Sequence, residues 1–337
     1  MNRILISDPT LRDGNHAVKH QLSSAQMAIY AKAADKAGIP IVEVGHGNGL
    51  AGSSLQVGKA LLNDREMLET VRKNLKHSKM GIHVIPGFAT LQNDIQMAMD
   101  LGVDVFRVAS HCTEADTTQR HISHLRENGK EVFGVLMMSH MASKQVLAEE
   151  AQKMESYGAE AVILMDSAGN YLPNDVTDKV GELIRQISVP VGFHAHNNLG
   201  MAIANSVAAA QAGATILDGC ARGFGAGAGN AQLEVLVAVL DRMGYQTGID
   251  LYKMLDAADI AEQHLITNIP YPSSLSIVSG TAGVFSAFAP HVMRIAKEYQ
   301  VDHRDIFFEL GRRKVVAGQE DMILEVASQL AREEKAI

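Results

Sequence analysis

The stretch KAGIPIVEVG (residues 36–45) carries the pattern that decides the fold, because a helical segment ends at a glycine and a short β-branched apolar run follows directly. The same pattern returns in DLGVDVFRVAS (100–110), SYGAEAVILMD (156–166) and QAGATILDGC (211–220). The glycines that fit the helix ends, where the backbone needs a positive φ, are Gly38, Gly102, Gly158 and Gly213. The nearly all-apolar runs after them are typical of parallel strands covered on both faces.

Four further apolar runs fill the gaps between these repeats: ILISD (4–8), MGIHVIPG (80–87), VFGVLMMS (132–139) and PVGFHAH (190–196). Strict alternation of strand and helix gives either a closed barrel or a doubly wound sheet. Eight similar units in a chain of 337 residues favour the (β/α)8 TIM barrel.

The pattern changes after about residue 250. Residues 250–265 form a helical pattern, residues 268–283 contain prolines and serines, and the remaining tail is charged and helical. We therefore predict an α/β fold with a TIM-barrel catalytic domain over residues 1–255 and a helical C-terminal domain over 256–337. No low-complexity linker separates the two parts.

Composition excludes several functional classes. The net charge of −8 argues against a partner that is nucleic acid or an anionic membrane surface. No run approaches the roughly 18 apolar residues of a membrane span, and the N-terminus lacks a secretory signal. Cys112 and Cys220 are too few for a disulfide framework and favour a reducing compartment. These features predict a cytoplasmic location.

Polar residues end several of the predicted strands, and in a TIM barrel they would converge on one rim. The clearest motif is GFHAHNN, in which His194 and His196 stand two positions apart on a strand and so point to the same face. Neutral imidazoles at that spacing can share a Zn, Mn, Fe or Co ion. Two rim histidines without a metal are an equally good interpretation of this motif alone.

The segment DPTLRDGNH (8–16) places a cation, carboxylates and a histidine in the turn after the first predicted strand. Asp13 supplies the acidic ligand that the histidine pair lacks. Arg12 is suited to an oxyanion or a substrate carboxylate, and His16 to general-base catalysis. Taken alone, however, the motif is better explained by a helix N-terminus with Asp13 as its cap and Arg12 in solvent.

The glycine-rich run GFGAGAGNAQLE (223–234) matches only a loose form of the dinucleotide-binding fingerprint. It follows the last predicted strand rather than the first, so it lacks the Rossmann context. We interpret it as a loop that needs close backbone approach near the barrel mouth.

In this order, DPTLRDGNH, DSAG (166–169), GFHAHNNLG and RGFGAGAGN resemble the motifs of the DRE-TIM metallolyases. Within that group the whole chain resembles the 4-hydroxy-2-oxovalerate aldolases. The resemblance implies a TIM barrel with a C-terminal helical domain. It also implies cleavage of a 4-hydroxy-2-oxoacid to pyruvate and an aldehyde through a pyruvate enolate. The implied cofactor is a divalent metal, most often Mn2+, with Co2+, Mg2+ and Zn2+ as alternatives.

The same resemblance implies a role for individual residues. Asp13, His194 and His196 match the metal ligands. Arg12 matches the residue that stabilises the enolate, and His16 matches the base that takes the proton of the C4 hydroxyl. Ser167, in the DSAG segment, matches a substrate contact.

One segment departs from the family pattern. Relatives carry a sequence like YAGVYSSF, whereas this chain has TAGVFSAF (281–288), with Thr281 and Phe285 in place of both tyrosines. Phe285 is expected beside the substrate and offers no hydrogen bond, so substrate orientation or stereochemical control is expected to differ. Tyr271 is the candidate substitute. The resemblance further implies a partner, an acylating acetaldehyde dehydrogenase that receives the aldehyde in a heterotetramer.

Two alternatives stay open at this point. A Claisen-type acyl-CoA enzyme or an HMG-CoA-lyase-like enzyme of the same superfamily should show a basic patch for nucleotide phosphates, and no clear patch is present. A barrel that has lost catalysis and serves as a scaffold is disfavoured by the intact Asp13, His194 and His196.

Overall fold

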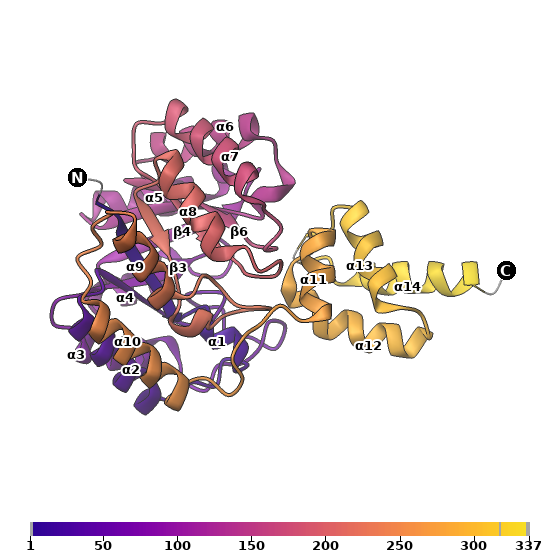
Figure 1. The fold of residues 1–337 in the computed structure, drawn as a ribbon, viewed down its shortest axis with the longest axis horizontal. Helices are drawn as coiled ribbons and strands as arrows, with labels where there is room; N and C mark the ends of the chain where they lie inside the picture. The colour runs from indigo at the N-terminus through magenta and orange to yellow at the C-terminus, as the bar shows by residue number, and fades with distance from the viewer. Residues whose placement is uncertain (1–2, 317, 335–337) are drawn as a thin grey trace.

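The computed structural model describes residues 3–316 and 318–334. Eight parallel strands close into a barrel, in which β1 pairs with both β2 and β8 (Figure 1). Each predicted strand run is present. The strands are β1 (Leu5–Leu11), β2 (Ile41–Val44), β3 (Lys79–Val84), β4 (Val105–His111), β5 (Glu131–Met137), β6 (Ala161–Asp166), β7 (Val191–Ala195) and β8 (Ile216–Asp218).

Helices surround the barrel and cover the outer faces of the strands (Figure 1). They are α2 (Ser24–Ala37), α3 (Asp64–Asn74), α4 (Gln96–Asp100), α5 (Gln119–Glu127), α6 (Lys144–Ser156), α7 (Pro173–Gln186), α8 (Ala202–Ala212), α9 (Leu233–Arg242) and α10 (Leu251–His264). The predicted terminating glycines are confirmed, since Gly38 and Gly213 cap α2 and α8 in the left-handed conformation. Gly102 and Gly158 also have positive φ.

Short helical turns lie in the loops. They are α1 (Gly14–Ala17), η1 (Leu91–Ile95), η2 (Ala115–Thr118), η3 (Ser139–Met141), η4 (Ala221–Gly223) and η5 (Ser286–Phe288). Among the described residues, no helix is long and apolar enough to cross a bilayer.

The strands are buried on both faces, as their apolar sequences predict. One core fills the barrel interior with Ile41, Val105, Phe133, Val135, Ile163 and Ile216. A larger core lies between the strands and the helices. Each Val, Ile or Phe side chain that is fully buried there stabilises the fold by about 1.5–3 kcal/mol. The strands are thus a rigid support for side chains at their carboxyl ends.

Four helices form a second body beside the barrel: α11 (Ser274–Ala282), α12 (Ala289–Tyr299), α13 (His303–Arg312) and α14 (Asp321–Glu334) (Figure 1). They have their own apolar core, which includes Phe288, Val292, Phe307, Leu310 and Val326. We call this body the C-terminal domain. Helix α10, which contains residues 255 and 256, packs against α2 and α9 of the barrel. The division between those two residues stays a prediction.

Candidate metal centre and active site

Asp13, His194 and His196 come together at the carboxyl ends of the strands. Asp13 follows β1, while His194 lies in β7 and His196 directly after it. Asp13 Oδ2 is 3.4 Å from His194 Nε2 and 3.5 Å from His196 Nε2, and all three side chains are buried. One carboxylate oxygen and two imidazole nitrogens within 4.8 Å of one another could hold one divalent ion.

The outer nitrogen of each imidazole is already engaged. His194 Nδ1 donates to Asp218 Oδ2 at 2.8 Å, and His196 Nδ1 donates to the carbonyl oxygen of Asp166 at 2.9 Å. Such bonds fix the tautomer and direct the Nε2 lone pairs toward a metal. His194 Nε2 is buried without a hydrogen-bond partner among the described residues. The interpretation as two fully satisfied rim histidines therefore does not hold for His194.

The charges around His194 also fit a cation. Burial by itself lowers the pKa of His194, but Asp13 and Asp218 together raise that pKa above its usual value. Two carboxylates thus favour a positive charge on this side of the imidazole. A divalent ion at Nε2 would take the place of a proton there.

Asp13 occupies the N-cap position of α1, yet its side chain makes no capping hydrogen bond. Its Oδ2 instead accepts a hydrogen bond of 3.0 Å from Asn230 Nδ2. Although burial raises the pKa of Asp13, Arg12 and the two histidines hold it well below its usual range, so the carboxylate is ionised. The capping interpretation is therefore wrong, because the carboxylate points into the cluster.

Arg12 is buried at the same site rather than solvated. Its Nε donates to Glu43 on β2, and its Nη1 donates to the carbonyl oxygen of Gly47 at 3.3 Å. Its Nη2 is buried and has no partner among the described residues. A buried N–H group left unpaired beside the carboxylate–imidazole cluster is suited to an anionic oxygen of a ligand.

Glu43 also belongs to a buried chain of charges that crosses the barrel interior. Arg107 on β4 donates to Glu43 Oε2 at 2.9 Å and to Asp218 Oδ2 at 2.5 Å. Burial raises the pKa of Glu43, but Arg12 and Arg107 bring it below its usual value. We call Arg12, Glu43, Arg107, Asp218 and His194 the ion chain. The ion chain links the Arg12 guanidinium to His194, which is one of the predicted metal ligands.

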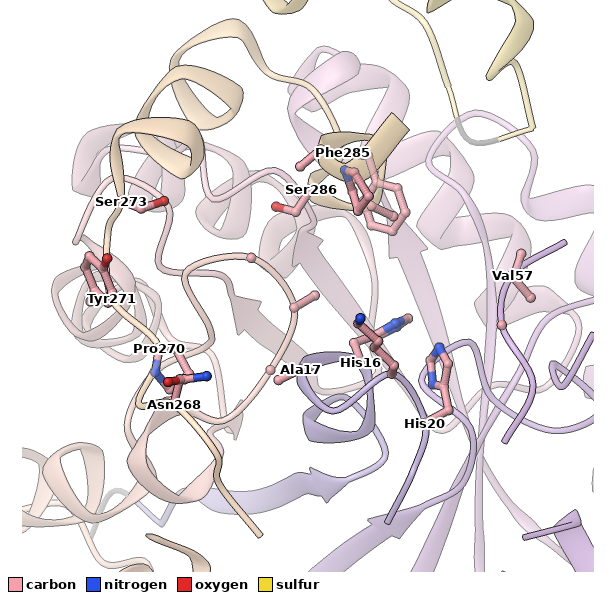
Figure 2. Close-up of a pocket in the computed structure, with 18 of the residues that line it drawn as sticks. His16, Ala17, His20, Val57, Asn268, Pro270, Tyr271, Ser273, Phe285 and Ser286 are labelled. Carbon is pink, nitrogen blue, oxygen red and sulfur yellow. The ribbon is translucent and has the colours of Figure 1, made fainter. Parts of the chain in front are cut away.

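His16 lies on the wall of a cavity (Figure 2). Its ring packs against Gly47, where an added Cβ would lie 2.5 Å from the imidazole and would displace the ring. Burial, which Asp13 opposes and Arg12 reinforces, lowers the pKa of His16 to about 4. The ring is therefore neutral near pH 7 and able to accept a proton.

Two more histidines pack beside His16. The His20 ring is 5.0 Å from His16, and it stacks on His46 with 3.6 Å between centroids. Both His46 nitrogens bond the backbone, since Nδ1 accepts from Asn48 and Nε2 donates to Gly58. His46 therefore supports the wall of the cavity.

The cavity has a volume of about 760 Å3 and lies between the barrel mouth and the start of the C-terminal domain. Phe285 and His16 both line it, and Tyr271 lies across it from Phe285 (Figure 2). Phe285 also lines a second cavity of about 270 Å3 together with Ser167. The Thr281 hydroxyl donates to the backbone of its own helix and lines neither cavity.

Ser167 is buried at the end of β6. Its Oγ accepts a 2.9 Å hydrogen bond from the backbone N–H of Met138. The hydroxyl hydrogen therefore remains available to an acceptor in the second cavity.

Sequence reasoning missed Asn230, which lies in the glycine-rich loop. It donates to Asp13, and its Oδ1 is buried without a partner among the described residues. An added Cβ at Gly229 would lie 2.0 Å from the carbonyl oxygen of Gly223, so the predicted close backbone approach is confirmed. The only sequence signal for Asn230 is its place at the end of the glycine run.

Comparisons with known proteins agree with this architecture. Residues 3–261 match the HMGL-like family, and residues 270–332 match the DmpG-like communication domain. The chain is 65% identical to a 4-hydroxy-2-oxovalerate aldolase of Spirochaeta aurantia, over 97% of this chain and 96% of that one. It is 62% identical to the aldolase of the same name in Pectobacterium atrosepticum, over 98% and 96% of the two chains.

The chain belongs to the 4-hydroxy-2-oxovalerate aldolase family. It is therefore an aldolase, a carbon–carbon lyase, and its buried carboxylate–imidazole cluster fits the divalent metal of that family. Full-length relatives at 52–65% identity carry the same name, so the acyl-CoA and HMG-CoA-lyase-like alternatives are not favoured.

Solved structures that resemble this aldolase show the fold alone. The carboxyl transferase domain of Rhizobium etli pyruvate carboxylase, with pyruvate and biocytin, aligns with a TM-score of 0.81 at 16% identity. The alignment covers 99% of this chain and 61% of that one. The N-terminal domain of a putative aldolase from Bacteroides vulgatus aligns with a TM-score of 0.72 at 22% identity, over 86% and 96% of the two chains.

Proposed function

We propose that this aldolase cleaves 4-hydroxy-2-oxovalerate, or a close 4-hydroxy-2-oxoacid, to pyruvate and an aldehyde at a Mn2+ ion. Asp13, His194 and His196 hold the ion. The observation that carries this proposal is the buried, unpartnered Nε2 of His194, which faces one carboxylate and lies beside a second imidazole. When bound, the ion supplies Lewis acidity to the 2-oxo group of the substrate.

The remaining chemistry comes from side chains of the barrel. His16, neutral near pH 7, takes the proton of the C4 hydroxyl. The C3–C4 bond then breaks, C4 leaves as the aldehyde, and the electron pair stays on pyruvate as its enolate. Arg12 Nη2 donates to the oxygen that becomes negative in that enolate. Protonation of the enolate at C3 gives pyruvate.

Ser167 and Phe285 bind the substrate in this proposal. Both line the same small cavity, and Phe285 also faces the larger cavity that contains His16. Ser167 supplies a hydroxyl donor, whereas Phe285 supplies only an apolar surface. The aldehyde end of the substrate is therefore held near Phe285 by shape rather than by a hydrogen bond.

We also propose a protein partner, an acylating acetaldehyde dehydrogenase that binds in a heterotetramer and receives the aldehyde. The match of residues 270–332 to a communication domain supports this partner. Purification without any such dehydrogenase, and no change in rate when one is added, would contradict it. A cytoplasmic location is supported by Cys112 and Cys220, which are both buried and unpaired.

The deciding experiment measures pyruvate release from several 4-hydroxy-2-oxoacids, after chelation and after return of Mn2+, Co2+, Mg2+ or Zn2+. We expect no release without metal and the fastest release with Mn2+. His194→Ala and His196→Ala should each abolish metal-dependent release. Full activity in both variants would overturn the metal site, and no release with any ion would overturn the proposed substrate class.

A further inference from the structure

Asn198 lies two residues beyond His196 and is fully buried where three parts of the chain meet. Its Nδ2 donates to Ser279 Oγ at 3.1 Å and to Ser286 Oγ at 2.9 Å, and both serines belong to the C-terminal part of the chain. Its Oδ1 accepts a 3.3 Å hydrogen bond from the backbone N–H of Ala228 in the glycine-rich loop. Both amide hydrogens and the amide oxygen of Asn198 are therefore engaged.

Three glycines from three separate segments pack directly around Asn198. An added Cβ at Gly169, in the loop after β6, would lie 2.7 Å from the Asn198 backbone nitrogen. At Gly280, in α11, it would lie 2.9 Å from the Asn198 Cβ, and at Gly227 it would lie 3.0 Å from Oδ1. Real Cβ atoms essentially never come closer than 3.0 Å to such neighbours. The packing therefore fixes Asn198 against the loop after β6, the glycine-rich loop and the C-terminal domain together.

The backbone next to Asn198 positions His196 and Asn230, whose side chains belong to the candidate metal centre. Residues 195–197 run antiparallel to residues 229–231, with hydrogen bonds of 2.8 and 3.1 Å between them. This pairing places His196 opposite Asn230, and both side chains approach Asp13 Oδ2. The Asn198 side chain accepts from the backbone of Ala228, so it joins the same two segments one residue beyond the end of this pairing. The two serines are therefore connected through Asn198 to the backbone of both segments, two residues from His196 on one and two residues from Asn230 on the other.

We propose that Asn198 is a positioning residue through which the C-terminal domain holds His196 and Asn230 in place at the metal centre. The physical basis is a direct set of hydrogen bonds with close packing, rather than spatial proximity alone. This inference rests on the proposed metal site. It adds that the site's affinity for metal depends on serines that lie outside the barrel.

The test measures Mn2+ binding to the metal-free enzyme by the electron paramagnetic resonance signal of free Mn2+, with pyruvate release as a second readout. Asn198→Ala should weaken Mn2+ binding by about tenfold, the effect expected when an outer partner of a metal ligand is lost. Asn198→Leu keeps the approximate size of the side chain, but it loses both donors to the serines and the acceptor for Ala228. It should weaken binding in the same way.

The double variant Ser279→Ala/Ser286→Ala breaks the same bonds without touching the barrel. It should also weaken Mn2+ binding, and adding Asn198→Ala to it should have little further effect, because the contact is shared. The matched control is His140→Ala. His140 donates a 2.8 Å hydrogen bond to the carbonyl oxygen of Gly283. Loss of this bond loosens the attachment of the C-terminal domain at a point that does not involve Asn198. Binding of Mn2+ to this control should stay within about twofold of wild type.

Three results would overturn the inference. The first is wild-type Mn2+ binding in both Asn198 variants. The second is an unchanged affinity in the double serine variant, because Asn198 would then act within the barrel alone. The third is an equal loss in His140→Ala, because general loosening of the domain would then explain the effect. If His194→Ala and His196→Ala bind Mn2+ like wild type, the proposed metal site itself fails, and that outcome is distinct from these three.

Discussion

Asp218→Asn tests most directly whether the charged side chains inside the barrel increase the affinity of the candidate site for metal. One oxygen of Asp218 accepts from both His194 Nδ1, at 2.8 Å, and Arg107 Nη2, at 2.5 Å. Burial raises the pKa of Asp218, but Arg107 and His194 bring it below its usual value, so the residue is a carboxylate. The asparagine keeps the size of the side chain, removes its charge and replaces one oxygen by an amide nitrogen, while its remaining oxygen can still accept from His194.

The expected effect is on metal affinity rather than on folding. Arg107 keeps its 2.9 Å ion pair with Glu43, so the variant leaves no buried cation unpaired. His194, however, loses the carboxylate that makes its Nε2 a better ligand. Loss of such an outer partner typically weakens metal binding by about 10- to 100-fold. This range corresponds to about 1.4–2.8 kcal/mol of binding free energy.

The assay is titration of metal-free enzyme with Mn2+, followed by pyruvate release at saturating Mn2+. Much of the lost activity should return at saturation, because the ligands themselves remain. Ser7→Ala is the matched control, since it removes a 3.2 Å bond to Arg107 without touching His194. It should bind Mn2+ normally. An Asp218→Asn dissociation constant within about twofold of wild type would refute the role that we give to the ion chain.

Three further predictions concern the cavity and the ion chain. His16→Ala should slow cleavage by about 100-fold or more, but it should slow the exchange of the pyruvate C3 protons with deuterium much less. An equal fall in both rates would show that His16 is not the base for the C4 hydroxyl. Phe285→Tyr adds a hydroxyl to the cavity and should change aldehyde preference or C4 stereoselectivity in the reverse addition. Unchanged products would show that the phenylalanine at position 285 does not control substrate choice. Arg107→Met leaves Glu43 and Asp218 facing each other in the interior, so urea unfolding of the metal-free enzyme should show a loss of about 3–5 kcal/mol; a loss below about 1 kcal/mol would contradict the ion chain as a buried network.

The strands, and the meeting of His194 and His196 at one strand end, could be predicted from the sequence because their signals are local. Each strand is an apolar run, four of them directly after a helix-ending glycine, and His194 and His196 are two residues apart at the end of one strand. Asp13 shows the limit of such reasoning. Its own motif favoured a helix cap, and only the ordered set of motifs along the chain pointed to the metal. In the structure the residue stands at the cap position, but its side chain turns into the barrel mouth.

The supporting residues could not be predicted, because their partners are distant in sequence. Arg107 is 111 residues from Asp218, and Asn198 is 81 residues from Ser279. An asparagine has no charge and no characteristic spacing, so the motifs that contain Asn198 and Asn230 do not reveal that these residues position other groups. Their roles follow from burial and from hydrogen bonds that exist only in the closed barrel.

Closure of the barrel by β8 against β1 has a consequence for the timing of metal loading in the cell. Asp13 lies near the start of the chain, and its partner Asn230 is made 217 residues later. A ribosome that adds 5–20 residues per second needs about 10–40 s to cover that length. A nascent chain without β7 and β8 has no complete cluster to offer an ion. Any choice among divalent ions is therefore made by the finished barrel against the free metal pool of the cell.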